Sequence, residues 1–122
     1  PISSAAASAT GTRPPNTSLA TARVIFIYPR SPGIDASDVE AELLNVKKFR
    51  NLGLQITRDP DKADVVLEVT QGDDTVTVMY SAIDIQTKAV LAAGKATNIF
   101  GFATQMAAKD FVGKVEKARS NP

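Results

Sequence analysis

The stretch VIFIY at positions 24–28 decides the fold. It is continuously apolar and combines β-branched side chains with two aromatic rings, a composition typical of strands. Such a run predicts a strand that is buried on both faces, and therefore a central position in a sheet. Pro29 and the sequence SPG at 31–33 are expected to end this strand.

The segment that follows predicts a helix that begins near Ser37 and ends at Gly53. Ser37 and Glu40 have the spacing of a capping box, in which the serine oxygen accepts a hydrogen bond from a free amide of the first turn. Glycine suits the left-handed residue that ends many helices. Apolar side chains recur at helical spacing between these two ends, at Val39, Leu43, Val46 and Phe49.

The rest of the chain predicts four more strands and a second helix. The sequence QGDD at 71–74 and residues 86–88 read as turns, and Gly94 is expected to mark a β-bulge. The second helix is expected over 103–119, with an apolar face that includes Phe111 and Val115. The four strands are expected at 54–58, 65–70, 75–85 and 89–100.

This order, β-α-β-β-β-β-α, predicts an α+β domain with a single mixed β-sheet. The first strand, first helix and second strand form a crossover unit, whose two strands should be parallel. The later strands are joined by short turns and should be antiparallel. Both helices need an apolar surface to cover, so we expect them to pack on one face of the sheet.

Residues 1–18 are expected to form an extended, low-complexity N-terminal arm ahead of an α+β domain at 19–122. Sixteen of these eighteen residues are Pro, Ser, Ala, Thr, Gly or Asn, and such small side chains bury little area. An arm of this kind can dock on a neighbouring subunit through its backbone. The residues we expect to make that contact are Ile2, Arg13, Pro14, Pro15 and Leu19.

Composition excludes several classes of function. The 122 residues carry a net charge of +1, which gives no field to attract nucleic acid, and no apolar run is long enough to span a membrane. The absence of Cys and His argues against zinc, haem and iron–sulfur sites, so no cofactor is expected. Because the chain begins at Pro1 rather than Met, we expect a processed or trimmed product without any export signal.

Four segments together resemble a type of small exported bacterial α+β domain that occurs in uncharacterised secreted proteins. The segments read ARVIFIYP, GLQITRDPDKADVVLEVT, DIQTKAVLAAGKAT and AAKDFVGKV. More remotely, they are similar to the N-terminal domain of TolB and to the periplasmic part of curli-secretion lipoproteins. Lys88 stands where those remote families usually place Gly. The resemblance implies a periplasmic or extracellular location and a non-catalytic interaction domain.

Candidates for catalysis are few, and we expect no enzyme. Glu68 and Asp84 could form a carboxylate pair of the glycosidase type, and a Ser–Lys dyad or a site at Tyr80 needs only common residues. The preferred interpretation is that Glu68 and Asp84 both face solvent on the open side of the sheet. A cleft with strongly perturbed acidities around these residues would favour an enzyme instead.

Three further motifs have simple structural interpretations. DPDKAD at 59–64 lacks the Gly and Glu of an EF-hand loop, so turn or helix capping by Asp59, Asp61 and Asp64 is preferred over a calcium site. Asn16, Thr17 and Ser18 fit a glycosylation pattern that arises easily by chance. The basic residues of the last helix are expected to form a solvated face: Lys109, Lys114, Lys117 and Arg119.

Three functions remain open from the sequence. The first is a non-enzymatic exported domain that associates with itself, as an oligomer or an extracellular filament, with the arm on a neighbouring subunit; other envelope proteins are possible partners. The second is a monomeric periplasmic scaffold or ligand-binding domain with the arm as a tether. The third is a hydrolase with a carboxylate or Ser–Lys site.

Overall fold

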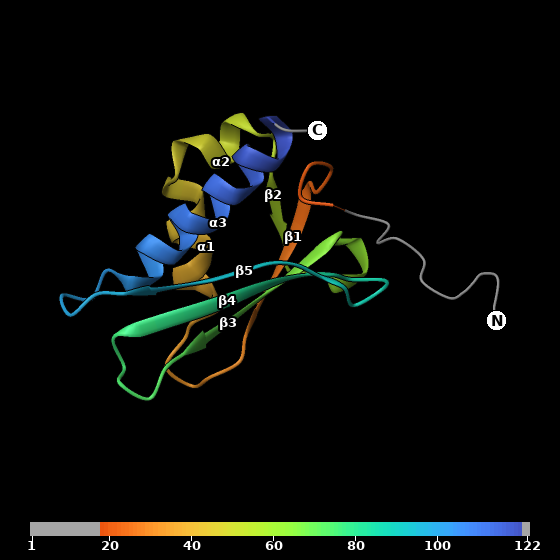
Figure 1. Cartoon of the computed structure of the whole chain (residues 1–122). Helices are drawn as coiled ribbons and strands as arrows, with labels where there is room; N and C mark the ends of the chain where they lie inside the picture. The colour runs from red at the N-terminus through yellow and green to blue at the C-terminus, as the bar shows by residue number, and fades with distance from the viewer. Residues whose placement is uncertain (1–17, 121–122) are drawn as a thin grey trace.

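Strand β1 (Val24–Pro29) lies inside a five-stranded sheet of order β2-β1-β3-β4-β5 (Figure 1). The computed structural model describes residues 18–120. Ile25 and Ile27 are buried, but Tyr28 is 46% exposed. The predicted central position is confirmed. Burial on both faces is wrong, because the helices cover only one face of the sheet (Figure 1).

The sheet is mixed, as predicted. Strand β1 pairs in parallel with β2 (Gln55–Thr57) on one side and with β3 (Val65–Gln71) on the other. Strands β3, β4 (Thr77–Asp84) and β5 (Val90–Thr97) then form an antiparallel meander. The later strands are therefore antiparallel only from β3 onward. The link from β2 to β3, which contains the short 3₁₀ helix η1 (Pro60–Lys62), returns the chain parallel to β1.

The first predicted helix is two helices. Helix α1 (Ala36–Asn45) ends where Val46 adopts an extended conformation, and α2 (Lys47–Asn51) follows. The predicted capping box is wrong: Asp35 is the N-cap, and its Oδ1 accepts a hydrogen bond from the Ser37 amide at 2.9 Å. Glu40 instead forms an ion pair with Arg58 at 2.8 Å.

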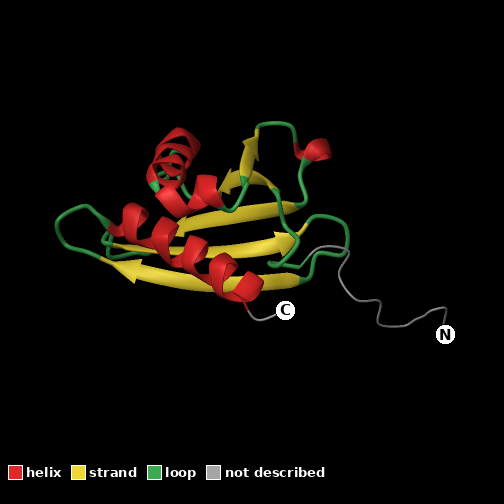
Figure 2. Cartoon of the chain, turned by 90° about the horizontal axis from the view of Figure 1, so that it is seen from above, coloured by secondary structure: helices red, strands yellow, loops and turns green. Residues whose placement is uncertain are grey.

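Helix α3 (Ala103–Ser120) lies across β4 and β5 and also packs against α1. All three helices lie on the same face of the sheet, which confirms the predicted layer arrangement (Figures 1 and 2). No helix within residues 18–120 combines the length and apolar character needed to cross a membrane. The core lies between the two layers and includes Ile25, Val65, Leu67, Tyr80, Leu43, Phe49, Phe111 and Val115.

The predicted bulge at Gly94 is wrong. The strand irregularity lies between Ala82 and Ile83 of β4, where the register to β5 shifts, whereas Gly94 pairs regularly with Tyr80. Gly94 has a different role. A Cβ atom at Gly94 would lie 2.5 Å from Asp110 Oδ2 and 2.8 Å from Tyr80 Cε1, so a side chain there would collide with the residues that cover it.

Candidate interaction surfaces

Of the predicted arm contacts, only Leu19 lies within the described residues. Ile2, Arg13, Pro14 and Pro15 lie outside them, as do Asn16 and Thr17 of the glycosylation pattern. Leu19 is half-buried and packs against the core. The docking of the arm on a neighbour therefore stays a prediction, and Leu19 marks where the arm joins the fold.

Leu19 also lines a groove between β5 and the C-terminal half of α3, which we call the β5–α3 groove. Its volume is about 470 Å³. Its lining is mostly aliphatic and includes two lysines. The lining residues are Leu19, Leu91, Ala92, Ala93, Lys114, Lys117 and Ala118. The groove can therefore accept an apolar group that carries negative charge beside it.

A polar cluster under the groove holds α3 against the sheet. The Tyr80 hydroxyl donates to Asp110 Oδ2 at 2.6 Å, and Lys114 Nζ reaches the same oxygen at 3.0 Å. Lys114 Nζ also lies 5.3 Å from the centroid of the Tyr80 ring, a distance that suits a cation–π contact. Gly94 gives this cluster the room it needs above β5.

The acidities in this cluster are explained by burial and by the hydrogen bonds. Burial, followed by the hydrogen bond to Asp110, raises the pKa of Tyr80 well above its usual value. The hydrogen bond from Tyr80 lowers the pKa of Asp110. Burial acts in the opposite direction, and the hydrogen bond and charge of Lys114 lower the pKa further. Tyr80 therefore stays protonated and Asp110 ionised near neutral pH, an arrangement that positions α3 rather than activating a nucleophile.

Strand β5 is an edge of the sheet, and its outward backbone groups are only partly covered. The Asn98 amide bonds to Val76 O across the sheet at 2.9 Å, so by alternation Ala93, Lys95 and Thr97 direct their backbone groups away from β4. Lys114 Nζ donates to the outward carbonyl of Ala93 at 2.7 Å. Lys114 thus occupies a backbone group in the middle of this edge strand that could otherwise pair with another strand.

The loop between β5 and α3 carries the most exposed large apolar side chains of the described residues. Ile99 and Phe100 are 75% and 77% exposed; Phe102 in the same loop is 54% exposed, and Met106 on the first turn of α3 is 42% exposed. We call these four residues the apolar tip. In Figure 1 the loop lies at the left end of the molecule, beyond the end of β5. Its exposure is unusual because soluble proteins rarely group such side chains without a partner.

Asn98 organises the apolar tip. Its Oδ1 accepts hydrogen bonds from the amides of Phe100 and Phe102, at 2.8 and 3.4 Å. Its Nδ2 lies 3.4 Å from the Met106 sulfur. Gly101 has a φ of +90°, which lets the loop turn between the two phenylalanines. The tip is therefore presented in one defined geometry.

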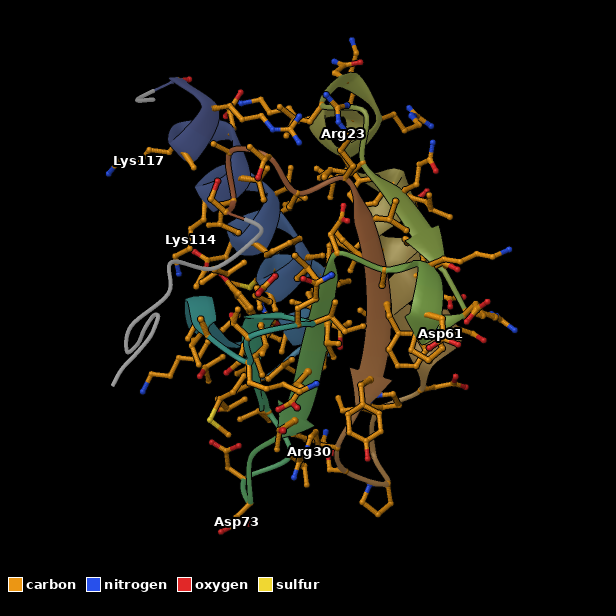
Figure 3. All side chains as sticks on the ribbon, turned by 90° about the vertical axis from the view of Figure 1, so that its right-hand side faces the viewer. Arg23, Arg30, Asp61, Asp73, Lys114 and Lys117 are labelled. Carbon is orange, nitrogen blue, oxygen red and sulfur yellow. The ribbon has the colours of Figure 1, made fainter. Side chains whose placement is uncertain are left out.

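Acidic residues accompany the apolar tip. The β3–β4 hairpin contains Asp73 and Asp74, and it lies beside Asn98 through the bond from the Asn98 amide to Val76 O. Asp74 is held in place by the Thr77 hydroxyl at 2.8 Å, and this hydrogen bond lowers the pKa of the Asp74 carboxyl. Asp73 is exposed and points outward from the lower end of the molecule in Figure 3.

The apolar tip was not predicted as a surface. The strand expected at 89–100 included Ile99 and Phe100, whereas β5 ends at Thr97. The available signal was the sequence NIFGF at 98–102, in which Asn is a turn residue and Gly allows a positive φ. The large side chains of this segment are of the types common in strands. Their exposure could be recognised only once the structure showed that β5 ends at Thr97.

A second groove lies between the first two helices and α3. It has a volume of about 360 Å³, and the break at Val46 forms part of its wall. Lys47, Lys48 and Lys109 surround it, and Lys48 also forms an ion pair with Glu116 at 3.0 Å. We call it the helical groove.

The carboxylate pair considered for catalysis does not form. Glu68 and Asp84 point to opposite faces of the sheet, since β3 buries Val65, Leu67 and Val69 while β4 buries Asp84. Glu68 forms an ion pair with Arg30 at 3.3 Å. The solvent-facing position predicted for Asp84 is wrong: Asp84 is fully buried and accepts hydrogen bonds from the Thr87 amide and hydroxyl at 3.0 and 2.6 Å.

Of the three carboxylates at 59–64 that were predicted to cap a turn or helix, Asp59 does so, whereas Asp64 bonds to amides of a distant strand. Asp59 accepts from the Asp61 amide at 3.0 Å and so caps η1. Asp64 accepts from the amides of Arg23 and Val24, at 3.0 and 3.1 Å, and fixes the start of β1. Within residues 18–120, no three acidic side chains are grouped closely enough to hold a metal ion.

The prediction of a solvated basic face on α3 is wrong for two of its four residues. Lys109 and Lys117 are exposed, but Lys114 belongs to the polar cluster described above. Arg119 is partly buried and donates to the carbonyls of Leu52 and Ala22. Burial lowers the pKa of its guanidinium, and the nearby Arg23 acts in the same direction.

The comparisons with known proteins give only distant similarity. No family model and no curated protein matches this sequence. Two crystal forms of the PelC dodecamer from Paraburkholderia phytofirmans are similar in structure, each at 18% identity and a TM-score of 0.44. One match covers 77% of this chain and 85% of the PelC chain, and the other covers 85% and 90%. At this similarity, neither the assembly nor the role of PelC transfers to this chain.

Proposed function

We propose that this protein is a non-enzymatic domain that associates with copies of itself. The observation that carries the proposal is the apolar tip, in which Ile99 and Phe100 are three-quarters exposed. Exposed apolar clusters of this kind mark sites of association. The hydrogen bonds that the Phe100 and Phe102 amides donate to Asn98 fix the loop before any partner arrives, which reduces the entropy lost on binding.

The proposal includes the N-terminal arm as a second contact with the neighbouring copy. The arm joins the described fold at Ser18, next to Leu19, and Leu19 lines the β5–α3 groove. A neighbour bound near that groove therefore lies within reach of the arm. The location that accompanies this function, periplasmic or extracellular, follows from the resemblance to exported domains and is part of the proposal.

The experiment is sedimentation velocity of the full chain over a wide range of concentration. We expect the wild-type protein to form species larger than one chain, and Phe100→Asp to remain a monomer, since the charge prevents burial of the tip. Leu44→Asp is the matched control, because Leu44 is also exposed, at 47%, but lies on α1 away from the tip.

Deletion of residues 1–17 tests the arm separately. We expect the shortened chain to associate more weakly than the full chain, because the contacts of the arm with the neighbour are lost. If the two chains assemble equally, the arm has no part in association. If the full-length wild type remains a monomer at every concentration, the proposed function fails altogether.

The alternative of a monomeric ligand-binding domain is favoured by one observation, the helical groove. Lys47, Lys48 and Lys109 surround it, and the partly buried Val46 and the buried Val112 contribute apolar wall. Such a groove suits a small anion with an apolar part. In calorimetric titrations with an alkyl carboxylate, this alternative predicts binding that Lys109→Glu abolishes, by a chain that stays monomeric.

A further inference from the structure

We infer that copies of this chain join head to tail, with the apolar tip of one copy in the β5–α3 groove of the next. This inference rests on the proposed self-association and names the two surfaces that make it. The tip contributes Phe100 and its neighbours, and the groove contributes Leu91, Ala92 and Ala118. Apart from Leu19 in the groove, both surfaces come from β5, α3 and the loop that joins them.

The two surfaces lie at opposite ends of these elements. The apolar tip lies between the end of β5 and the first turn of α3, whereas Lys117 and Ala118 lie near the end of α3. An α-helix rises about 1.5 Å per residue, so the 14 residues from the start of α3 at Ala103 to Lys117 separate the loop from this end of the groove by roughly 21 Å. The tip therefore cannot reach the groove of its own chain, and only a second copy can bring the two together.

The chemistry of the surfaces is complementary. The tip is apolar with Asp73 and Asp74 beside it, and the groove is apolar with the exposed Lys117 in its lining, whereas Lys114 is already paired with Asp110. Figure 3 shows Asp73 and Lys117 pointing outward from opposite ends of the molecule. Contact between unlike ends thus pairs acid with base, whereas contact between two tips places the acidic hairpins together.

The size of the groove also suits this occupant. At about 470 Å³ it falls within the usual range of ligand pockets, roughly 300–1,000 Å³, which is large enough for an aromatic side chain and a neighbour. An aromatic ring that enters the groove meets aliphatic walls and lies beside Lys117, whose amino group can make a cation–π contact with it. Phe100 is the most exposed large apolar side chain of the described residues.

A contact between two different surfaces is heterologous, so two joined copies together keep one free tip and one free groove. Such contacts close into a ring or continue as a filament. The base of the arm, beside Leu19, then lies next to the inserted tip of the neighbour. The arm and the groove would thus hold the same neighbouring copy.

The experiment mixes two variants that each lack one surface. Phe100→Asp removes the tip, and Ala118→Glu places a charge in the groove; Lys117→Glu is a second groove variant if Ala118→Glu alters the circular dichroism spectrum. Each variant alone should be a monomer in sedimentation velocity. In an equal mixture, the intact groove of one binds the intact tip of the other, and we expect species of two chains and nothing larger.

Two controls accompany the mixture. Lys109→Glu introduces the same change of charge as Lys117→Glu on the exposed face of α3 outside the groove, and Leu44→Asp matches the tip variant. Both should assemble as the wild type does. An equal mixture of either control with the wild type should form species larger than two chains in sedimentation velocity.

Three results overturn the inference. A groove variant that assembles like the wild type shows that the tip binds elsewhere, or that residues 1–17 of the same chain occupy the groove. An equal mixture that stays monomeric shows that the surfaces do not bind each other. In both cases a wild type that still assembles leaves the proposed self-association intact. A wild type that is always monomeric removes the inference and the proposed function together.

Discussion

At the scale of single residues, the polar cluster on β5 explains a glycine that the sequence leaves ambiguous. Gly94 lies under Asp110, Tyr80 and Lys114, and the nearest of these atoms would be 2.5 Å from a Cβ at this position. Tyr80 in turn packs edge-on against Phe111, with ring centroids 5.8 Å apart. One small residue on the strand therefore allows a helix to approach the sheet with three polar side chains between them.

Gly94→Ala should lower the free energy of unfolding by about 1–3 kcal/mol, because the added methyl group displaces the cluster. Gly113→Ala is the matched control. No atom lies within 4 Å of a Cβ at Gly113, and alanine favours helix, so this change should stabilise the protein by up to about 1 kcal/mol. Urea denaturation measures both. Equal effects of the two substitutions would show that the cluster does not restrict position 94.

Stability in acid should depend on Asp110. Its pKa is lower in the folded than in the unfolded protein, chiefly through the hydrogen bond from Tyr80. A carboxyl with a depressed pKa contributes stability above its unfolded pKa of about 3.9, and that contribution is lost as the pH falls through the folded pKa. Asp110→Asn should therefore flatten the loss of stability below about pH 4, measured by thermal unfolding at a series of pH values. Asp61→Asn, on the exposed turn of η1, is the control and should change the loss of stability in acid less than Asp110→Asn does.

At the scale of elements, the sequence predicted what depends on local pattern and missed what depends on distant neighbours. The strand at 24–28 and the left-handed Gly53, with a φ of +74°, were predictable because an apolar run and a helix end are local features. The choice of Asp35 rather than Ser37 as N-cap was not, since both residues suit that position. The ion pair of Glu40 with Arg58 of the next loop removes the partner that Ser37 needs.

The turn between β4 and β5 gives a prediction at this scale. Lys88 has a φ of +65°, a conformation that glycine adopts without strain. Lys88→Gly should raise the free energy of unfolding by up to about 1 kcal/mol. Lys88→Ala is the control, because it keeps the strain and loses the bond from Lys88 Nζ to Ile85 O, and it should destabilise the protein slightly. Thermal unfolding measures both variants. A higher Tm for Lys88→Ala than for Lys88→Gly would contradict this explanation.

At the scale of the whole molecule, none of the association surfaces could be located from the sequence. The groove joins Leu19 to residues more than 70 positions away, and such a surface exists only after the sheet has formed. The apolar tip lies in one short segment, but its side chains differ from core residues only in their exposure. The arm and its composition were visible, whereas the surface beside its base was not.

Association should also be visible as a change in thermal stability. A contact that forms only between folded chains stabilises the folded state by mass action, so the Tm of the wild type should rise with protein concentration. The Tm of Phe100→Asp should be the same at every concentration. Differential scanning fluorimetry over a hundredfold range of concentration makes this comparison. A wild-type Tm that does not change with concentration would speak against association of the folded chains.

The parallel register of β1 has a consequence for the synthesis of the chain. Strand β1 is made first, but Ile25 pairs with Val65, which is added about 40 residues later. At the usual 5–20 residues per second, the ribosome needs roughly 2–8 s to supply that partner. Until Ile56 of β2 is added, about 30 residues after Ile25, the most apolar stretch of the protein has no strand beside it, and its β3 side stays open for the whole interval. In a nascent chain of this kind, VIFIY is accessible to a chaperone before it can pair within its own sheet.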